Sequence, residues 1–371
     1  MIKSNKKIAV VIINYNGEKY LKKFLPSVVN FSDKKLSEIF IIDNNSSDGS
    51  INFIKKNYSK IKLIQNDKNY GYAKGYNIGL KKIKSEYIVL LNNDVEVTEN
   101  WLNPMCKELE KNKYIGTCQP KILSFNNRNY FEYAGASGGY LDFLGYPFCR
   151  GRIFNTVEED NGQYDKKKEI FWSSGACMMI RNKLFKEAGG FDESFYAHME
   201  EIDLCWRIKG MGYLNFCYPE SKVYHLGGGT LQYDNPKKTY LNFRNNLIML
   251  FKNESLISLT IKFPLRLLFD LFSVFYFMIS KKSLKHPYSI IRAYFNIFLK
   301  IPLLIIKKRN IIPRDKTEDK IIIPIEYYLN GKSRYCDLWL FFTKIDKNMY
   351  FCSLSLSLIK KELIINYHEE F

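Results

Sequence analysis

Residues 8–16 read IAVVIINYN, a run of six apolar residues that ends in a polar tripeptide. The same design returns as IFIIDNN at 39–45 and as YIVLLNND at 87–94. Short β-branched runs of this kind are typical of strands buried on both faces. We predict strands at 8–13, 39–42, 61–64 and 87–91, alternating with helices at 18–30, 49–57 and 72–83. This alternation predicts an α/β fold with a doubly wound, Rossmann-like parallel sheet.

Polar side chains follow three of these strands, at Asn14 and Asn16, at Asp43, and at 92–94. Parallel sheets bind ligands at the carboxyl ends of their strands, so these exits are where we expect chemistry. For any single exit the alternative is ordinary turn chemistry, because Asn and Asp also favour turns and helix caps. Three such exits on one sheet edge favour a binding site.

From residue 96 to about 230 the pattern is less regular. We expect strands near 115–123, 131–141, 170–180, 213–217 and 222–225, and helices near 182–188 and 199–209. Such a mixture predicts a second half with a mixed sheet, which completes the site begun by the first half.

Three groups of side chains in this pattern could carry chemistry. Asp94 could bind Mg²⁺ or Mn²⁺ if a nucleotide diphosphate supplied further oxygens. His225 follows a predicted strand and precedes the glycines 227–229, although a lone histidine is more often structural. Glu200, Glu201 and Asp203 open a predicted helix, where one of them could act as a general base. The alternative is that acids simply favour the first turn of a helix.

The chain resembles the family 2 glycosyltransferases of GT-A fold, especially their rhamnosyltransferase-like branch. Seven motifs carry the resemblance, in the family's order: VVIINYNGEKYL at 10–21, IIDNNSSDGS at 41–50, NYGYAKGYNIG at 69–79, LLNNDVEV at 90–97, SSGACMMIRNKLFKEAGGFDESF at 173–195, HMEEIDLCWR at 198–207 and VYHLGGGT at 223–230. Together they cover roughly residues 8–246.

The resemblance implies how a donor nucleotide would bind. Asp43 matches the acid that pairs with the uracil or thymine ring, and Asn14 and Asn16 line the same pocket. Lys74 matches a contact to base or ribose, and Asn93 belongs to the strand exit that faces the nucleotide. Gly227 and Gly228 belong to the loop beside the diphosphate.

The resemblance also implies roles in metal binding and catalysis. Asp94 matches the last acid of the D-x-D motif, which holds a divalent cation, with Asn92 at the first position as a variant of this branch. His225 resembles the histidine that completes the metal site. Glu201 stands where the family has its catalytic base, usually Asp. Glu200 and Asp203 remain alternatives for the base.

The implied reaction is a single displacement with inversion, from a UDP- or dTDP-sugar to a lipid-linked or polysaccharide acceptor in cell-surface glycan synthesis. Rhamnose is the favoured sugar. Two other interpretations stay open: a non-catalytic membrane-associated scaffold of the same shape, and a sugar nucleotidyltransferase, which would release pyrophosphate. The sequence does not determine the oligomeric state.

The formal net charge of +18 is uneven along the chain. Residues 237–314 carry 15 basic and 2 acidic side chains, whereas 315–371 are nearly neutral. Within the basic block, 258–280 is apolar except for Lys262, Arg266 and Asp270, spaced by four, and we expect this helix and one near 289–300 to lie in a membrane interface rather than cross it. The alternative is that both helices pack on the catalytic domain or on another subunit.

The partners predicted from this block are acidic lipid headgroups, for which Lys281, Lys282, Lys285 and the basic residues 307–309 are available. Nucleic acid is not expected, because such a surface does not need long runs of Leu, Ile and Phe. The eight cysteines form no C-x-x-C pair, and the apolar run at 8–13 has no cleavage site after it. We therefore expect a reducing, cytoplasmic setting, with the protein peripheral on the cytoplasmic face.

We divide the chain into a GT-A domain (1–236), a basic helical membrane-associating segment (237–314) and a tail without assigned role (315–371).

Overall fold

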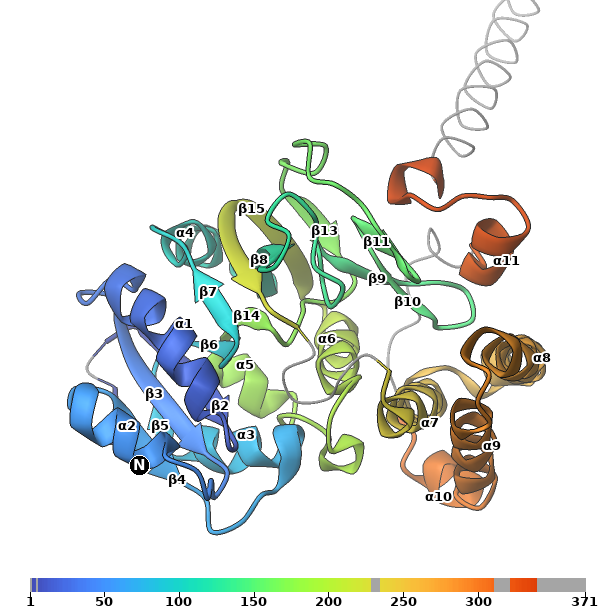
Figure 1. The fold of residues 1–371 in the computed structure, drawn as a ribbon, viewed down its shortest axis with the longest axis horizontal. Helices are drawn as coiled ribbons and strands as arrows, with labels where there is room; N and C mark the ends of the chain where they lie inside the picture. Colours follow the sequence, from blue (N-terminus) through green and yellow to red (C-terminus); the bar gives the residue numbers. More distant parts are fainter. Residues whose placement is uncertain (1, 5, 228–233, 310–320, 339–371) are drawn as a thin grey trace, which may run out of the picture.

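The computed structural model of the 371-residue chain describes residues 2–4, 6–227, 234–309 and 321–338. One mixed sheet runs through the molecule, in the order β13-β15-β8-β14-β6-β2-β3-β4, with β7 paired to β15. Helices cover both faces of this sheet, and a group of carboxyl-terminal helices lies at one side (Figure 1). The predicted α/β fold is confirmed.

The first half is the expected doubly wound unit. Its parallel strands are β2 (Ile8–Asn14), β3 (Ser37–Asp43), β4 (Lys62–Gln65) and β6 (Tyr87–Asn92), and its helices are α1 (Glu18–Phe31), α2 (Ser50–Asn57) and α3 (Gly71–Lys81). Successive side chains of a strand point to opposite faces. Accordingly Ile8, Val10 and Ile12 pack in the core that contains α1, whereas Ala9 and Val11 pack in the core that contains α3. Both faces are buried, which explains why the strands lack polar alternation.

The second half extends the sheet with antiparallel strands. Its main strands are β8 (Ile115–Ser124), β13 (Lys168–Ile170), β14 (Cys177–Arg181) and β15 (Leu214–His225), and β14 runs antiparallel to both β6 and β8. Its helices are α5 (Asn182–Glu187), the 3₁₀ turn η1 (Glu193–Phe195) and α6 (Glu200–Gly210). Mixed pairing in this half is as predicted.

Several boundaries in this half differ from the sequence prediction. The strand expected at 170–180 is two strands, β13 and β14, which β15 and β8 separate in the sheet. The segment expected as a strand at 131–141 is irregular up to β9 (Gly139–Leu141), because Gly135 and Gly138 have φ of 139° and 111°. The strands expected at 213–217 and 222–225 are one bulged strand, β15.

Several short elements in both halves of the α/β domain went unpredicted. They are β1 (Ile2–Lys3), β5 (Ile83–Lys84), β7 (Val95–Val97), α4 (Asn103–Lys111) and the strands β10 (Pro147–Cys149), β11 (Arg152–Ile153) and β12 (Thr156–Val157). Strands β9 to β12 form a separate antiparallel sheet. The strands among them have two or three residues each, too few for a hydrophobic period to be recognised, whereas α4 has nine.

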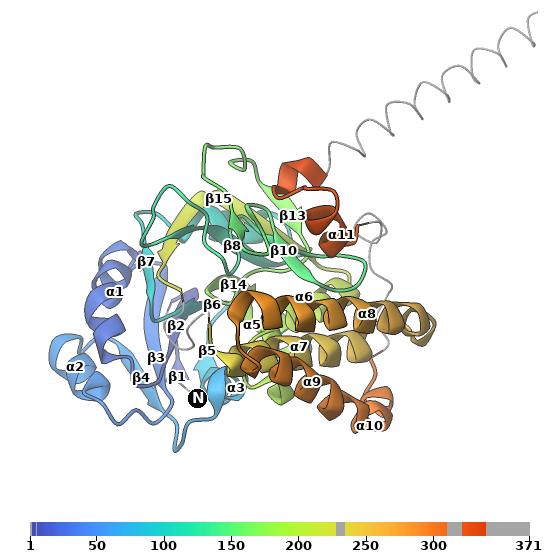
Figure 2. The ribbon, with the colours of Figure 1, turned by 45° about the vertical axis from the view of Figure 1, so that its right-hand side comes forward.

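The carboxyl-terminal helices are α7 (Pro236–Asn253), α8 (Leu256–Lys281), α9 (Lys285–Phe298), α10 (Ile301–Ile306) and α11 (Ile323–Tyr328). Helices α7, α8 and α9 lie side by side (Figure 2). The boundary drawn at 236 coincides with the start of α7 but stays a prediction. Of the tail drawn at 315–371, the structure describes 321–338.

Helix α8 has its polar stripe turned toward the protein. Lys262, Arg266 and Asp270 are all buried, and Arg266 Nε donates to Asp270 Oδ2 at 2.9 Å. Asp270 also accepts from the hydroxyls of Tyr146 and Tyr294. The opposite face exposes large apolar residues: Ile257, Ile261, Leu265, Leu268, Leu271, Phe272, Phe275, Tyr276 and Ile279. By length and composition α8 could cross a bilayer, but its polar stripe is engaged along the protein.

Candidate active site

The exits of β2, β3 and β6 meet in one network of hydrogen bonds. Asn14 Nδ2 donates to Asp43 Oδ1 at 3.1 Å, and Asn93 Nδ2 donates to Asn14 Oδ1 at 2.9 Å. Asp43 is fully buried and accepts two further hydrogen bonds from Ser46, while the backbone N–H of Asn16 donates to Ser46 Oγ. Four residues predicted to face the nucleotide are therefore connected at one edge of the sheet.

Gly17, at the start of α1, is a part of this network that the sequence analysis did not single out. A Cβ at this position would collide with Asn14 Oδ1 and with Asn93 Nδ2. The hydrogen bond between these two amides therefore requires glycine here. The signal in the sequence was the glycine that follows NYN, at the junction of strand and helix.

Sheet register brings Asp94 to His225. Strand β7 pairs with β15 so that Val95 lies opposite His225, and Leu226 N donates to Asp94 O at 3.0 Å. His225 Nε2 then lies 3.1 Å from Asp94 Oδ1, although the two residues are 131 positions apart. The Asn92 amide is also near, with Nδ2 3.4 Å from the same imidazole nitrogen.

Glu132 flanks the other side of His225, with Oε2 3.2 Å from Nδ1. Burial by itself would lower the pKa of His225, but Asp94 and Glu132 outweigh burial and raise that pKa well above its usual value. Each imidazole nitrogen therefore faces a carboxylate oxygen. No sequence signal pointed to Glu132, because it lies in the irregular segment that was expected to be a strand.

Asp94 and His225 fit a divalent cation that shares its shell with a second ligand. Within the described ranges, no cluster of three or more His, Cys, Asp and Glu is arranged to hold an ion unaided. Asp94 Oδ1, in the turn between β6 and β7, nevertheless lies 3.1 Å from His225 Nε2 at the end of β15, and carboxylate with imidazole is a donor set that Mn²⁺ accepts. A cation there would need further oxygens, as from a diphosphate.

The acids of helix α6 lie in two environments. Glu201 is half-buried, lines a cavity of about 760 Å³, and burial raises its pKa to about 7. Glu200 is buried, and burial together with the neighbouring Glu201 raises its pKa well above the usual value. A Cβ added at Gly175 would lie 3.7 Å from Glu201 Cβ, and the carbonyl of the adjacent Ala176 accepts a hydrogen bond from Asn92 N. Glu201 therefore lies beside the carboxyl end of β6.

The turn before α6 has a strained backbone, and a side chain of α7 holds it in place. Tyr196, His198 and Met199 have φ of 58°, 69° and 73°, in the left-handed region that non-glycine residues seldom adopt. The buried side chain of Asn245 donates to the carbonyls of Phe195, Ala197 and His198 at 2.9, 2.8 and 2.8 Å. Asn245 thereby fixes the backbone of the turn that precedes Glu200 and Glu201. The sequence gave no sign of this role, because Asn245 is simply one polar residue within a helix.

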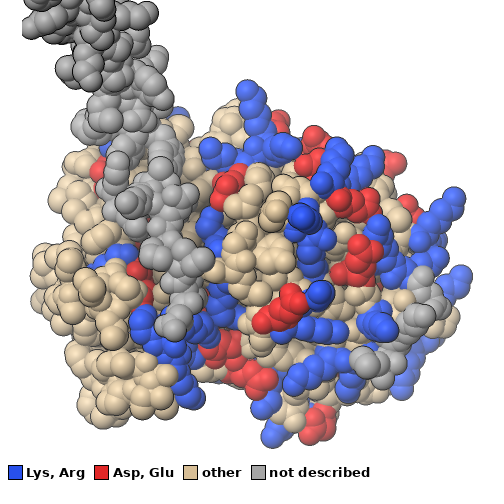
Figure 3. All heavy atoms as spheres, turned by 180° about the vertical axis from the view of Figure 1, so that it is seen from behind, with Lys and Arg blue, Asp and Glu red and all other residues tan. Residues whose placement is uncertain are grey.

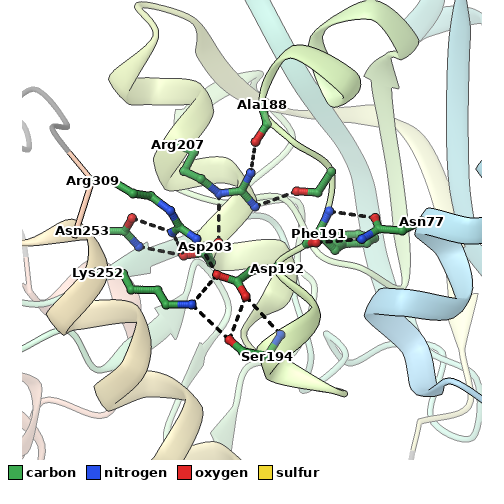
Figure 4. A network of polar contacts seen from close by, with 11 residues as sticks. Asn77, Ala188, Phe191, Asp192, Ser194, Asp203, Arg207, Lys252, Asn253 and Arg309 are labelled. Atoms are coloured by element: carbon green, nitrogen blue, oxygen red, sulfur yellow. Dashed lines mark hydrogen bonds and ion pairs between the residues drawn. The ribbon is translucent and has the colours of Figure 1, made fainter. Parts of the chain in front are cut away.

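Asp203 belongs to a different network, which joins α6 to Asn253 and Arg309 (Figure 4). It is fully buried and accepts from Arg207 Nε at 2.9 Å, Asn253 Nδ2 at 2.8 Å and Arg309 at 2.5 Å. Arg309 and Lys252 also pair with Asp192. With its oxygens so occupied, Asp203 anchors α6 to the carboxyl-terminal segment and is the weakest of the three candidates for the base.

The remaining predicted residues lie at the edge of the site or outside the described part. Lys74, on α3, pairs with Glu193 at 3.3 Å and makes no described contact with the Asp43 network. Gly227 has φ of 68°, a conformation that suits glycine. Gly228, like residues 229–233, lies outside the described residues.

The fold and this edge of the sheet define a nucleotide-sugar-dependent transferase of GT-A type. Residues 9–189 match the family model described as Glycosyl transferase family 2. The resemblance to glycosyltransferase family 2 drawn from the motifs is thus confirmed over this range.

Curated relatives include several rhamnosyltransferases. N-acetylglucosaminyl-diphospho-decaprenol L-rhamnosyltransferase of Mycobacterium tuberculosis is 23% identical over 59% of this chain and 75% of its own length. Rhamnosyltransferase WbbL of Escherichia coli is 23% identical over 55% and 78%. The dTDP-rhamnosyl transferase RfbF of Shigella flexneri is 22% identical over 70% and 84%.

Solved structures share the fold. Residues 1–349 of TarS from S. aureus, in complex with UDP-GlcNAc, match with a TM-score of 0.54 at 16% identity, over 81% of this chain and 84% of that one. GalNAc-T7, with UDP, GalNAc and Mn²⁺, matches with a TM-score of 0.53 at 20% identity, over 67% and 48%. The predicted GT-A fold is confirmed by these likenesses.

Proposed function

We propose that this glycosyltransferase is a metal-dependent, inverting enzyme that moves a sugar, rhamnose in the favoured case, from a UDP- or dTDP-sugar to a lipid-linked or polysaccharide acceptor. The observation that supports it most is the position of Glu201. Its carboxylate lines a cavity beside the end of β6, where the Asp43 network and the Asp94–His225 pair also lie.

In the proposed reaction, the first-half network orients the nucleotide. Asp43 and Asn14 face the base, and Asn93 connects them to the turn that bears Asp94. Asp94 and His225 would hold Mg²⁺ or Mn²⁺, which when bound offsets negative charge on the diphosphate.

Glu201 accepts the proton of an acceptor hydroxyl, which attacks the anomeric carbon of the donor as the bond to the nucleoside diphosphate breaks. The raised pKa of Glu201, about 7, suits a base that works near neutral pH. Burial and the neighbouring Glu201 raise the pKa of Glu200 well above its usual value, so in this proposal Glu200 supports the turn and Glu201 takes the proton.

We also propose that α8, α9 and α10 rest on the cytoplasmic face of a membrane. The helices expose Phe272, Ile279 and Ile306 at 62%, 78% and 80%, an arrangement that costs free energy in water. Seen from behind, the side of the molecule that carries these helices is largely free of charge, with basic residues beside it (Figure 3). Lys282 and Lys285 remain available for acidic headgroups, whereas Lys281 pairs with Asp234 and Arg309 with Asp192.

The buried polar stripe of α8 favours docking on the surface over crossing the bilayer. A crossing helix would have to carry the Arg266–Asp270 pair, together with Tyr146 and the protein around it, into the hydrocarbon.

The proposed function is tested by thermal stabilisation of the full chain with a panel of UDP- and dTDP-sugars, with and without Mn²⁺. A true donor at 100 times its dissociation constant should stabilise the protein by about 2.7 kcal/mol. Asp94→Ala should lose the Mn²⁺-dependent part, and Glu201→Gln should keep it while abolishing transfer. Stabilisation by no nucleotide sugar would favour the scaffold, and release of pyrophosphate would favour the nucleotidyltransferase.

A further inference from the structure

The acids Asp192 and Asp203 stand at the two ends of the segment that carries the proposed base. Asp192 caps the 3₁₀ turn η1, where its Oδ1 accepts from Ser194 N at 3.0 Å. Asp203 lies in the first turn of α6 and is fully buried. The left-handed turn at 196–199 and Glu201 lie between the two acids. A group that holds both acids in place therefore also holds the backbone that carries Glu201.

One guanidinium bridges these two acids (Figure 4). Arg309 Nη2 donates to Asp192 Oδ2 at 2.5 Å, and Arg309 Nη1 donates to Asp203 Oδ1 at 2.5 Å. Within the described residues, no other side chain contacts both carboxylates. An arginine suits this bridge because its nitrogens form a rigid planar fork, whereas a lysine offers a single charged point.

Each of the two acids also has a cation of its own. Asp203 pairs with Arg207, whose Nε donates to Asp203 Oδ2 at 2.9 Å. Asp192 pairs with Lys252, whose Nζ donates to Asp192 Oδ2 at 2.6 Å. A third cation is therefore not needed to neutralise the two carboxylates. What Arg309 adds to the network is the direct connection between them.

Arg309 is itself held by the carboxyl end of α7. Its backbone N–H donates to Lys252 O at 2.8 Å, and its Nη1 donates to Asn253 Oδ1 at 2.9 Å. It follows α10, which packs on α7, and its side chain is only 24% exposed. The carboxyl-terminal helices therefore present a fixed guanidinium to the segment 192–203.

We propose that Arg309 is a positioning residue for the transfer reaction. By bridging Asp192 and Asp203 it fixes the segment between them, and so fixes the place of Glu201. This assignment rests on the proposed function, in which Glu201 is the base. It also extends the working parts of the enzyme beyond the domain predicted at 1–236, because the bridge is supplied by the carboxyl-terminal segment.

Donor binding should not depend on this bridge. The groups proposed to hold the donor, Asp43, Asp94 and His225, lie at the exits of β3 and β6 and at the end of β15. Within the described part of the chain, none of them contacts the bridge. Loss of the bridge should therefore slow the chemical step and leave donor affinity unchanged, since a shift of about 1 Å in a catalytic group can cost about a hundredfold in rate.

Arg309→Lys in the full chain tests the assignment, because it keeps the charge and removes the fork. The turnover measured is release of UDP or dTDP, with Mn²⁺, from the nucleotide sugar that stabilises the protein most, with water taking the place of the acceptor hydroxyl. We expect kcat to fall about tenfold or more. Calorimetry with UDP and Mn²⁺ should give an affinity within about twofold of the wild-type value, a separation that a general weakening of the fold would not produce.

Arg334→Lys is the matched control and should leave kcat unchanged. Arg334 is exposed, and its side chain makes no hydrogen bond or ion pair with the described residues. Asp192→Asn breaks the other end of the bridge and should lower kcat as Arg309→Lys does. The double variant should be no slower than Arg309→Lys alone, because the two residues act as one unit. Should Arg309→Lys fail to fold, Asp192→Asn decides alone.

Equal kcat in Arg309→Lys and Arg334→Lys overturns the assignment, and so does a fall in kcat that is matched by an equal loss of affinity for UDP. A double variant whose loss is the product of the two single losses overturns the bridge. In each of these cases the wild-type protein turns over and the proposed function stands. If the wild-type protein releases neither UDP nor dTDP from any nucleotide sugar, the proposed function is wrong, and Arg309 positions no base.

Discussion

Replacing Asn245 by Ala should loosen the turn that leads into helix α6. The two protons of its Nδ2 are shared among three carbonyl oxygens of residues 195–198, at 2.8–2.9 Å. At a net 0.5–1.5 kcal/mol for each of two hydrogen bonds, the variant should lose about 1–3 kcal/mol of unfolding free energy. Each left-handed residue of the turn costs about 1–3 kcal/mol of backbone strain. The hydrogen bonds from Asn245 offset a comparable amount, so without them the strained conformation is no longer stabilised.

Urea denaturation measures the loss of stability, and hydrogen exchange of the amides at 196–199 measures loosening of the turn. Asn242→Ala is the control: it truncates the same residue type one helical turn earlier, where the side chain makes no described hydrogen bond, and should change stability by less than about 0.5 kcal/mol. Turnover should fall in Asn245→Ala more than stability predicts, because Glu201 shifts with the turn. Equal stability and equal exchange in the two variants would refute the reasoning.

Three further predictions follow from the site and the surface. Gly17→Ala should destabilise the protein by about 1–3 kcal/mol and weaken UDP binding, because the new methyl group separates Asn14 from Asn93; calorimetry with UDP measures the second effect. Transfer should require ionised Glu201 and so rise with pH through about 7, falling to about a tenth of its plateau one pH unit below, whereas a profile flat between pH 5.5 and 8 would move the base elsewhere. Phe275→Glu with Ile279→Glu should reduce binding to phosphatidylglycerol vesicles about tenfold or more, while Tyr114→Glu, equally exposed but far from α8, should not.

The sequence predicted the structure best where a regular hydrophobic pattern ends in polar side chains. Strands β2, β3 and β6 were placed within about two residues, because uninterrupted β-branched runs exist only where both faces of a strand are buried. Asp94 and His225 were named as partners from motifs alone, and the register of β7 with β15 brings them to 3.1 Å. Asp203 was kept, with Glu200, as an alternative to Glu201, since spacing on a helix cannot tell which carboxylate is paired.

The sequence analysis did not identify residues whose role depends on contacts with distant parts of the chain. Glu132 reaches His225 from an irregular segment, Arg309 reaches Asp203 across 106 positions, and Asn245 reaches a turn 47 to 50 positions earlier. No local pattern encodes such contacts, because they depend on how distant segments are packed.

The orientation of α8 likewise depends partly on its sequence and partly on tertiary packing. Its sequence alone establishes a narrow polar stripe on an apolar helix, since charges spaced by four fall on one face. Tertiary contacts decide which face of α8 packs against the protein. The buried Arg266–Asp270 pair is stabilised by the hydroxyls of Tyr146 and Tyr294 and by the carbonyl of Leu144. The apolar face of the helix is therefore exposed. The amino-acid order thus determined the strands and the chemical groups at their ends. Packing decided which of those groups meet, because hydrogen-bond partners for buried charge exist only once the chain has folded.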